Sequence, residues 1–498
     1  MSRRVSSVLV VGRDAAAFVA ALAICRSLGR TGVRVQLLEL PSLLKPVDVY
    51  AGLPALHGLN RMLGLEEADV LAACAGVPVM AQRFSNWGRG RRPFLIGYDT
   101  PATSGGNAGF FQYWLKAKGE GLRVELEDFS LAAAAAKQGR VPSDHLPAGP
   151  VSAAPGYHLD ASSYVALLRR AALQEGVEIV SGTIGAVSAG DHGIEQIALK
   201  DGRRMGADLY VDATGADATL IGALGSDFTS WAEWLPCDRI LAASGKKLSP
   251  LPAFSEISAF KGGWVGLHPL QDRTALVACY ASRDCPDAET SELLPIVAGI
   301  ALDQDAFVTP FRTGIRQRPW VANCVALGDS AVALEPLSAV QLHLIHLAVS
   351  HLITLFPADA GNMMEAVAYT RLMHSHAVNL RDFQAAHYKL NRRYDEPFWD
   401  RVRQAAGPES LEEKIRLFAA RGMIPLREDE TFQEESWTAL LAGHGVAPRG
   451  YDPRVDLLSQ QQHMETIQQR LRAIGDQVRA MPTVEASLAG VAARQDSA

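Results

Sequence analysis

The chain has 498 residues, of which 48% are hydrophobic, and it carries a formal net charge of −6. This length suits about two to four domains, and the hydrophobic content is sufficient for a large buried core. A mildly acidic chain without a block of basic residues lacks the surface by which proteins hold nucleic acid, so we expect no such partner.

Cysteine use and hydropathy predict a cytoplasmic protein that makes no membrane contact. The cysteines are scattered without a C-x-x-C pair, as expected where thiols stay reduced. They are Cys25, Cys74, Cys237, Cys279, Cys285 and Cys324. No uncharged apolar run reaches the roughly 18 residues that a membrane span needs, since Arg13-Asp14 interrupts the N-terminal apolar stretch.

The N-terminal segment predicts a strand, a tight turn, a helix and a second strand. Val8–Val11 is a continuous apolar run of the kind buried in a parallel sheet. Residues 15–28 carry apolar side chains at helical spacing, and residues 33–39 suit a second strand. This order is the first βαβ unit of a dinucleotide-binding fold, with Gly12 opening its turn and the acidic Glu39 ending its second strand.

The turn departs from the G-x-G-x-x-G pattern, because Asp14 replaces the second glycine and Ala17 the third. The second glycine lets the backbone approach a pyrophosphate, whereas Asp14 adds a side chain and a negative charge. A like charge about 4 Å away costs roughly 4 kcal/mol at an effective dielectric near 20. A micromolar ligand has only about 8 kcal/mol of binding free energy. The sequence therefore predicts weak cofactor binding, unless Asp14 turns away, is neutralised by Arg13, or serves only as a helix N-cap.

Other polar residues and glycines receive structural interpretations. His343 and His346 have a metal-like spacing on an apolar predicted helix, but no acidic or cysteine partner is apparent, which favours a structural role. Lys45 and Asp48 suit a solvated loop, with the cofactor mouth as the alternative. Gly105-Gly106 lacks a following G-K-S/T and predicts an ordinary loop. We expect no metal site and no nucleophile triad.

A series of short motifs runs through the chain in a fixed order. The series consists of Gln82–Gly88 (Q-R-F-S-N-W-G), Tyr157–Ala161 (Y-H-L-D-A), Asp212–Ala216 (D-A-T-G-A), Leu235–Arg239 (L-P-C-D-R), Trp264–Pro269 (W-V-G-L-H-P), Asn323–Asp329 (N-C-V-A-L-G-D), Glu335–Leu337 (E-P-L), His387–Leu390 (H-Y-K-L), Pro397–Trp399 (P-F-W) and Ser436-Trp437. In its order and spacing, this series resembles the flavin-dependent tryptophan halogenase family.

The resemblance implies an α/β fold with a Rossmann-like FAD-binding domain of the flavin monooxygenase type. It divides the chain into a discontinuous FAD-binding domain (1–80, 150–225 and 300–355), a β-rich substrate-side insert (81–149 and 226–299) and a mainly helical C-terminal region (356–498). In that last region an apolar stripe repeats at three and four residues, and it is too short for a free-standing coiled coil. We expect the stripe to pack against the body, with a homodimer contact as the alternative; it comprises Met464, Ile467, Leu471, Ile474 and Val478.

FAD is the cofactor that the resemblance implies. The residues expected at the flavin are Gly12, Asp14, Ala17, Glu39, Ile184, Gly215, Gly328, Asp329 and Leu342. The family's E-x-T-x-P strap appears here as Tyr50–Pro54, so both its glutamate and its threonine are absent. Weakened FAD binding is therefore expected at this segment as well as at the turn.

The positions that carry catalysis in the family are substituted. The family lysine, which binds hypohalous acid, stands five residues before the phenylalanine of the F-x-N-W motif, where this chain has Val79. The glutamate of E-P-L-E-S-T-G/S is Ser338, and Val340-Gln341 stand at the halide cradle. The second tryptophan of W-x-W-x-I-P is Gly266, which predicts extra room. We therefore assign no catalytic residue and expect halogenation to be lost.

Two functions follow from this pattern. The first is a non-catalytic family member that binds an indole-like small molecule, a peptide or a catalytically active paralogue. The alternative is an active FAD-dependent monooxygenase or halogenase that acts on an indole- or tryptophan-like substrate and is served by a flavin reductase.

Overall fold

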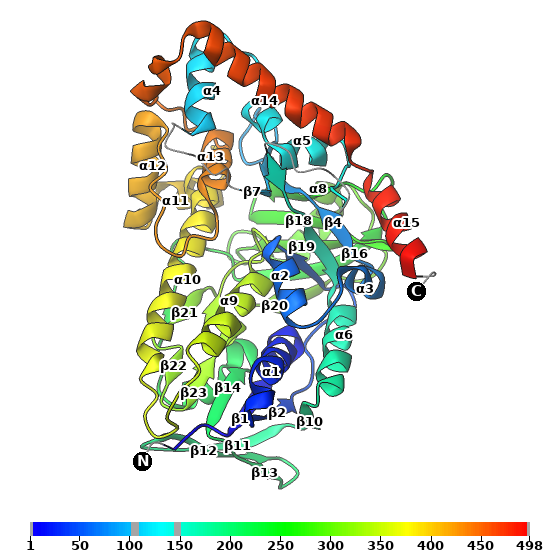
Figure 1. Ribbon diagram of the computed structural model, residues 1–498, viewed down its shortest axis with the longest axis vertical. Coiled ribbons are helices and arrows are strands. Elements are labelled where there is room, and N and C mark those ends of the chain that lie inside the picture. Colours follow the sequence, from blue (N-terminus) through cyan, green and yellow to red (C-terminus); the bar gives the residue numbers. More distant parts are fainter. Residues whose placement is uncertain (1–2, 101–108, 144–150, 496–498) are drawn as a thin grey trace. The chain divides into compact units, whose positions relative to one another are not determined.

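The computed structural model describes residues 3–100, 109–143 and 151–495 (Figure 1). Gly105-Gly106 lies outside the described residues. The chain forms two compact units, each discontinuous in sequence. The first unit comprises residues 1–76, 159–232 and 309–378, and the second comprises residues 77–158, 233–308 and 379–498. Within the described residues, no helix is both long enough and apolar enough to cross a membrane.

The first unit is built on a sheet with the strand order β10-β2-β1-β14-β23-β22. Its strands are β1 (Ser7–Gly12), β2 (Arg34–Glu39), β10 (Glu178–Ser181), β14 (Leu209–Ala213), β22 (Trp320–Val321) and β23 (Cys324–Ala326). All neighbours pair in parallel except β22 and β23. The side chains of Val8–Val11 are at most 1% exposed, which confirms the buried strand predicted from that run.

Helices cover this sheet, and the chain enters α1 directly from β1. They are α1 (Asp14–Leu28), α2 (Ala55–Met62), α3 (Glu67–Ala73), α6 (Ala161–Gln174), α7 (Thr219–Ala223) and α9 (Gln341–Thr354), with short helical turns η1 (Gly29–Thr31), η3 (Gly215–Asp217) and η4 (Gly328–Ser330). The helix α1 packs against α6 and α9. The predicted β-turn-α-β order is therefore confirmed.

Two small sheets, a short strand and part of a long helix complete the first unit. One sheet contains β11 (Ile184–Gly190), β12 (Gly193–Leu199) and β13 (Arg204–Met205), and the other contains β15 (Phe228–Ser230), β21 (Gly314–Arg316) and β24 (Val332–Ala333). The short strand β3 (Val49–Gly52) follows β2, and the long helix α10 (Glu365–Lys389) begins here and continues into the second unit.

The second unit contains a mostly antiparallel sheet in which β16, β19, β18, β17, β5 and β6 follow one another. Their bounds are β5 (Ala81–Ser85), β6 (Phe94–Gly97), β16 (Arg239–Lys246), β17 (Phe254–Phe260), β18 (Gly263–Pro269) and β19 (Arg273–Tyr280). Only β17 and β5 pair in parallel among these neighbours. The strand β4 (Val77–Val79) pairs instead with β9 (Gly156–Asp160).

The remaining helices of the second unit are α4 (Phe110–Gly119), η2 (Leu126–Phe129), α5 (Leu131–Lys137), α8 (Asp287–Ala298), α11 (Pro397–Gln404), α12 (Glu409–Arg421), α13 (Glu434–Gly443), α14 (Gln460–Ala480) and α15 (Val484–Gln495). The helix α14 packs against α4, η2 and α5 through its apolar stripe, of which Ile467, Ile474 and Val478 are buried. This confirms that the stripe packs against the body.

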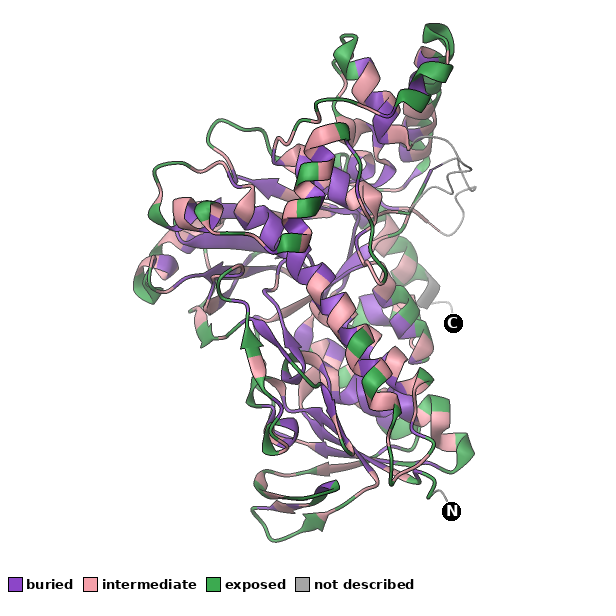
Figure 2. Ribbon diagram, turned by 90° about the vertical axis from the view of Figure 1, so that its left-hand side faces the viewer, coloured by how far each residue is buried: buried purple, intermediate pink, exposed green. Residues whose placement is uncertain are grey.

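Buried residues concentrate on the strands and the inner faces of the helices, and exposed residues gather on loops and outer helix faces (Figure 2). The two compact units, a parallel sheet covered by helices and a β-rich unit carrying C-terminal helices, confirm the predicted α/β class.

Candidate functional site

The turn between β1 and α1 begins with a glycine that has no room for a side chain. A Cβ atom added to Gly12 would lie 2.2 Å from the carbonyl oxygen of Ala213 in the neighbouring strand β14. Gly12 pairs with Glu39 on its other side. The ends of three parallel strands therefore meet at this turn, which is where dinucleotides bind in such folds.

Asp14 turns its carboxylate away from the helix axis and toward the segment that follows β2. The carboxylate accepts hydrogen bonds from the Ser42 hydroxyl at 2.5 Å and from the Leu43 amide at 3.4 Å. Its backbone is left-handed, with φ of 55°, which Asp tolerates better than most residues. Because Arg13 is the N-cap residue of α1 and Asp14 lies within the helix, the alternative that Asp14 serves as a helix N-cap is wrong.

Arg13 does not neutralise Asp14. Its guanidinium lies 3.5 Å from the carboxylate of Asp217, whose side chain is 65% exposed, so the pairing is weak. Its buried Nε atom has no hydrogen-bond partner among the described residues. The charge of Asp14 is therefore compensated mainly by the two hydrogen bonds from the 42–43 segment.

The Tyr50 hydroxyl lies at the first amide beyond Asp14. The Ala15 amide at the start of α1 lies near it. Burial, followed by the nearby carboxylate of Asp14, raises the pKa of Tyr50 above its usual range, and Asp48 and Asp329 contribute in the same direction. A neutral phenol therefore lies beside an amide of the kind that helix N-termini use to bind phosphate.

Glu39, the predicted ribose-binding residue, is held by neighbouring side chains at the end of β2. Arg169 donates to its two carboxylate oxygens at 3.2 and 3.3 Å, and the Ser181 hydroxyl donates at 3.1 Å. The carboxylate remains partly exposed, with 23% of its side-chain surface accessible. Glu39 is therefore fixed in orientation and retains accessible surface for a ribose hydroxyl.

A second glycine loop packs against the first turn of α1. Gly328 has a left-handed φ of 58°, and a Cβ atom at this position would lie 3.3 Å from that of Ala16. The next residue, Asp329, is exposed, yet its close surroundings of protein raise its pKa to about 6. The loop thus adds a further carboxylate near Tyr50 and Asp14.

The other expected flavin residues are placed around this edge of the sheet. Gly215 begins η3 directly after β14 and has a φ of 79°, which favours glycine. Ala17 is buried within α1, and Leu342 is buried in the first turn of α9, which contacts α1 and η4. Ile184 begins β11 and is partly exposed.

These residues fit FAD at the sheet edge and at Glu39, but the diphosphate position does not fit as it stands. The carboxylates of Asp14, Asp48 and Asp329 lie close enough to the Tyr50 hydroxyl to raise its pKa. A diphosphate at this turn meets like charges.

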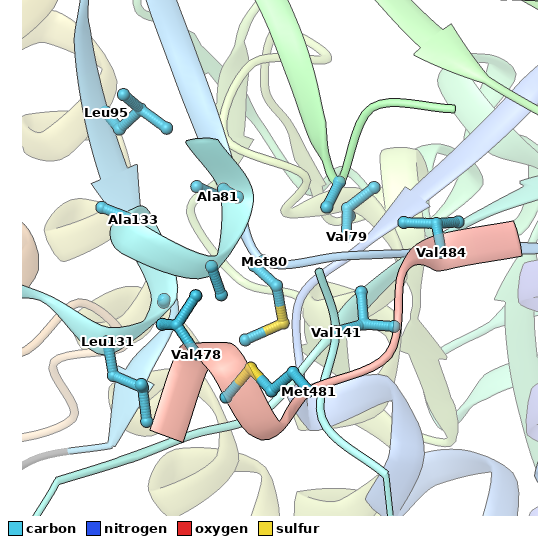
Figure 3. Packing of buried hydrophobic residues seen from close by; sticks show 14 of the residues in the cluster. Val79, Met80, Ala81, Leu95, Leu131, Ala133, Val141, Val478, Met481 and Val484 are labelled. Carbon is cyan, nitrogen blue, oxygen red and sulfur yellow. The ribbon is translucent and has the colours of Figure 1, made fainter. Parts of the chain in front are cut away.

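In the second unit, Val79 lies in a sealed apolar cluster rather than in a polar site. Its side chain is 1% exposed at the end of β4. Figure 3 shows it in a cluster with Val141, Met481 and Val484, which come from two distant parts of the chain. A lysine at this position would place an ammonium group in a cluster whose buried members are all apolar.

The space predicted beside Gly266 is filled, so that expectation is wrong. A Cβ atom at Gly266 would lie 2.7 Å from Nε2 of His268, two residues along the same strand. Nδ1 of His268 lies 3.4 Å from Nε2 of His158. The same Nε2 of His158 accepts a hydrogen bond from the Ser255 hydroxyl at 2.7 Å. Burial lowers the pKa of His268 to about 4, so the ring is neutral near pH 7. Trp264, the tryptophan that is retained, is fully buried.

Ser338 belongs to the first unit and lies just before α9. Ser338 and Ala339 both have left-handed backbones, with φ of 63° and 56°. Ser338 is 2% exposed, and its hydroxyl has no hydrogen-bond partner in the parts of the chain that the structure describes.

The remaining polar residues are accounted for locally. Burial, followed by the charge of His346, lowers the pKa of His343 to about 3, and burial also lowers the pKa of His346. The Lys45 amide donates to the carboxylate of Asp48 at 2.8 Å, so this loop is closed on itself. Sequence reasoning did not place Tyr50 near Asp14 at this turn, and the only signal was its replacement of the strap glutamate.

The second unit also contains a large cavity of about 1450 Å³. Its lining includes aromatic side chains (Phe94, Phe110, Phe111, Trp114 and Phe129) and charged side chains (Arg91, Asp99, Glu434 and Arg470). Thr438 also lines it, and its buried hydroxyl lacks a partner among residues 3–100, 109–143 and 151–495. A pocket with apolar walls and a few polar groups is typical of small-molecule sites.

Comparisons with known proteins assign the family. The family model described as tryptophan halogenase matches residues 7–460. The chain is 28% identical to tryptophan 7-halogenase KtzQ from Kutzneria sp. (strain 744), over 84% of this chain and 82% of that protein. It is 26% identical to tryptophan 7-halogenase RebH from Lentzea aerocolonigenes, over 96% of each chain.

Solved structures of flavin-dependent halogenases agree with this assignment. BrvH, a flavin-dependent halogenase from Brevundimonas sp. BAL3, has a TM-score of 0.91 at 30% identity, covering 98% of this chain and 99% of its own. Xcc4156, a flavin-dependent halogenase from Xanthomonas campestris, has a TM-score of 0.93 at 29% identity with the same coverage. The family uses FAD as its cofactor. Because the family model matches residues 7–460, this chain belongs to the tryptophan halogenase family.

Proposed function

We propose that this protein is a tryptophan halogenase family flavoprotein that no longer halogenates and acts by binding a ligand or a partner protein. The observation that carries the proposal is Val79, a sealed apolar side chain at the position where the resemblance places the family lysine. A valine has no nitrogen to bind or carry halogen. Ser338 likewise has no charge with which to replace the family glutamate.

The proposal includes weakened FAD binding. The residues that support it are Asp14, whose carboxylate lies at the turn, and Tyr50, whose hydroxyl lies near that carboxylate. FAD retention is supported by Glu39, which is oriented and still partly accessible. A flavin reductase is the expected partner for any remaining flavin chemistry.

The proposed ligand is an indole-like small molecule or a peptide. The aromatic lining of the large cavity in the second unit favours a flat hydrophobic group. The unpartnered hydroxyl of Thr438 offers a hydrogen bond to a polar group on such a ligand. A catalytically active paralogue is a further proposed partner.

The alternative is an active FAD-dependent halogenase or monooxygenase that acts on an indole- or tryptophan-like substrate. The names of the relatives favour it, because KtzQ and RebH are both described as tryptophan 7-halogenases. Under this alternative, another residue replaces the lysine.

One assay separates the two functions. The purified protein is incubated with a flavin reductase, FAD, NADH, oxygen and chloride or bromide, and tryptophan or indole is analysed by mass spectrometry. RebH in the same mixture is the positive control. We expect no halogenated and no hydroxylated product; a halogenated product would establish a halogenase, and a hydroxylated product would establish a monooxygenase. Calorimetric titration with tryptophan and indole then tests ligand binding directly.

A further inference from the structure

The large sheet of the second unit presents four polar side chains on one face. The strand β17 pairs with β5 so that Glu256 lies beside Arg83 and Ser258 lies beside Ser85. Residues two apart on a strand share a face, so all four side chains lie on the same side of the sheet. Nε of Arg83 lies 2.7 Å from a carboxylate oxygen of Glu256, and the two side chains form an ion pair.

A cavity of about 460 Å³ lies over this face, and its volume is within the usual range of small-molecule pockets. The helix α8 packs against β17, β18 and β19, and its last residues, Val297 and Ala298, line the cavity. Further apolar lining comes from Leu248, Pro252, Phe254 and Leu267. The cavity therefore combines apolar walls with a polar floor.

This cavity is separate from the sites described above. Leu267 lines it, whereas Gly266 and His268, its neighbours on β18, point to the opposite face of the sheet. Among the described residues, only Pro93 lines both this cavity and the larger aromatic one. A ligand bound here is therefore additional to the ligand of the proposed function.

The polar groups of the floor are buried, and their hydrogen bonds are incomplete. Ser85 is 7% exposed, and the side chain of Glu256 is 18% exposed. The Ser85 hydroxyl lies near the Glu256 carboxylate but has no well-aligned hydrogen-bond partner among the described residues. The Ser258 hydroxyl reaches the same carboxylate only at 3.4 Å. A ligand that completes these hydrogen bonds offsets the free energy that such buried groups cost.

We propose that this cavity binds a small neutral ligand that has an apolar body and a carboxamide-like head. The head donates a hydrogen bond to the Glu256 carboxylate and accepts one from the Ser85 hydroxyl. The guanidinium of Arg83, whose side chain is 41% exposed, is a second donor to the head. The apolar walls contact the body of the ligand.

The ion pair on the floor selects a neutral head over a charged one. An ammonium head is attracted by Glu256 and repelled by Arg83, and for a carboxylate head the two signs are reversed. Because the two charges lie 2.7 Å apart, their effects on a charged head largely cancel. A charged head would therefore lose its water without gaining an unopposed partner, which disfavours its binding.

Three probes with the same ring test this selection: phenylacetamide, phenylacetate and phenethylamine. Each is titrated into the full-length protein and followed by ligand-observed NMR. Phenylacetate cannot donate to Glu256 and phenethylamine cannot accept from Ser85, so each lacks one bond that phenylacetamide makes. One net hydrogen bond corresponds to roughly a 2- to 12-fold change in affinity. We expect phenylacetamide to bind more tightly than either charged probe by at least about this factor.

Variants then assign the binding to this cavity. Ser85→Ala should weaken phenylacetamide by about the same factor, and Ala298→Phe, which fills the cavity, should abolish its binding. Glu256→Gln leaves Arg83 unopposed, so phenylacetate should become the tightest of the three probes. The matched control is Glu289→Gln, because Glu289 pairs with Lys261 and does not line the cavity.

The folded state of each variant is checked by its thermal melt, and Ser85→Ala removes a hydroxyl on which no well-aligned hydrogen bond depends. Equal affinities for the three probes, phenylacetamide binding retained in Ala298→Phe, or an unchanged order of affinities in Glu256→Gln would each overturn the proposal. The same shift of preference in Glu289→Gln would also overturn it, because the effect would then not belong to the ion pair.

Discussion

Replacing Val79 by lysine should destabilise the protein and should not restore halogenation. The valine is 1% exposed, and its neighbours in the cluster are hydrocarbon side chains and methionines. Burial shifts the pKa of a lysine downward by about 3 to 5 units from its ordinary value near 10.4. The folded state would therefore hold the lysine neutral at about pH 7, whereas the unfolded chain would hold it charged.

The expected magnitude follows from the proton that is lost on folding. At about pH 7, and with a folded-state pKa below 7, the lysine is charged only in the unfolded chain. The difference between about pH 7 and the unfolded-state pKa of about 10.4 corresponds to roughly 4 to 5 kcal/mol of lost stability. Because the folded-state pKa of the lysine is depressed, the loss of stability is largest at low pH and falls by about 1.4 kcal/mol for each unit of pH toward 10. Excess volume adds about 1 to 3 kcal/mol at every pH. A typical stability of about 5 to 15 kcal/mol would be reduced severely.

Urea unfolding of Val79→Lys near pH 7 and near pH 9 measures this effect, with Val79→Met as the matched control for added volume. We expect Val79→Lys to gain stability relative to Val79→Met as pH rises. Equal stability of the two variants at both pH values would mean that the lysine reaches solvent and that the position is not sealed. Formation of halogenated tryptophan by Val79→Lys would refute the expectation that a lysine at this position is not sufficient for halogenation.

Three further predictions concern the turn, the strand β18 and pH. Asp14→Gly should tighten FAD binding, because it removes a charge and releases the 42–43 segment. Titration with FAD at low and high salt measures the change in affinity, and a gain that persists at high salt would show that charge is not the main cause. Gly266→Ala should lower the free energy of unfolding by about 1 to 3 kcal/mol, because its Cβ meets Nε2 of His268 at 2.7 Å. His268→Ala in the same chain should relieve that clash, and thermal melts of the single and double variants test whether it does. FAD affinity should rise as pH falls through about 6, because the close surroundings of protein raise the pKa of Asp329 to about 6 and protonation removes a negative charge there. Asp329→Asn should bind FAD with little pH dependence in this range, and the same pH slope in both proteins would assign the effect to another group.

The same shift in Asp329 has a consequence for stability, and its sign is the reverse of the usual carboxylate case. The folded pKa of Asp329 lies above its ordinary value, so the ionised form is disfavoured in the folded protein. Stability from this group is therefore present at low pH and is lost as pH rises toward about 6. Its exposure to solvent means that the effect on stability is small.

Local pattern was sufficient to predict the regular elements but not the contacts of the site. The apolar run at Val8–Val11 and the helical spacing after Asp14 depend on neighbours in sequence, so their strand and helix were predictable. The hydrogen bonds from Ser42 and Leu43 to Asp14 depend on how a loop returns to the turn, which periodicity does not encode. The same holds for His268, because only the side-chain direction within β18 shows that its ring fills the space beside Gly266.

The substitutions in this chain share a physical property that bears on the proposed loss of halogenation. Beside Gly266, the ring of His268 takes the free volume, and around Val79 the buried members of the cluster are apolar side chains. In both places the neighbours satisfy the packing around the substituted position, as selection for stability without selection for turnover would produce. Restoring one family residue at a time should therefore create a clash or a buried charge, and recovery of halogenation would require each residue to be exchanged together with the neighbour that compensates for it.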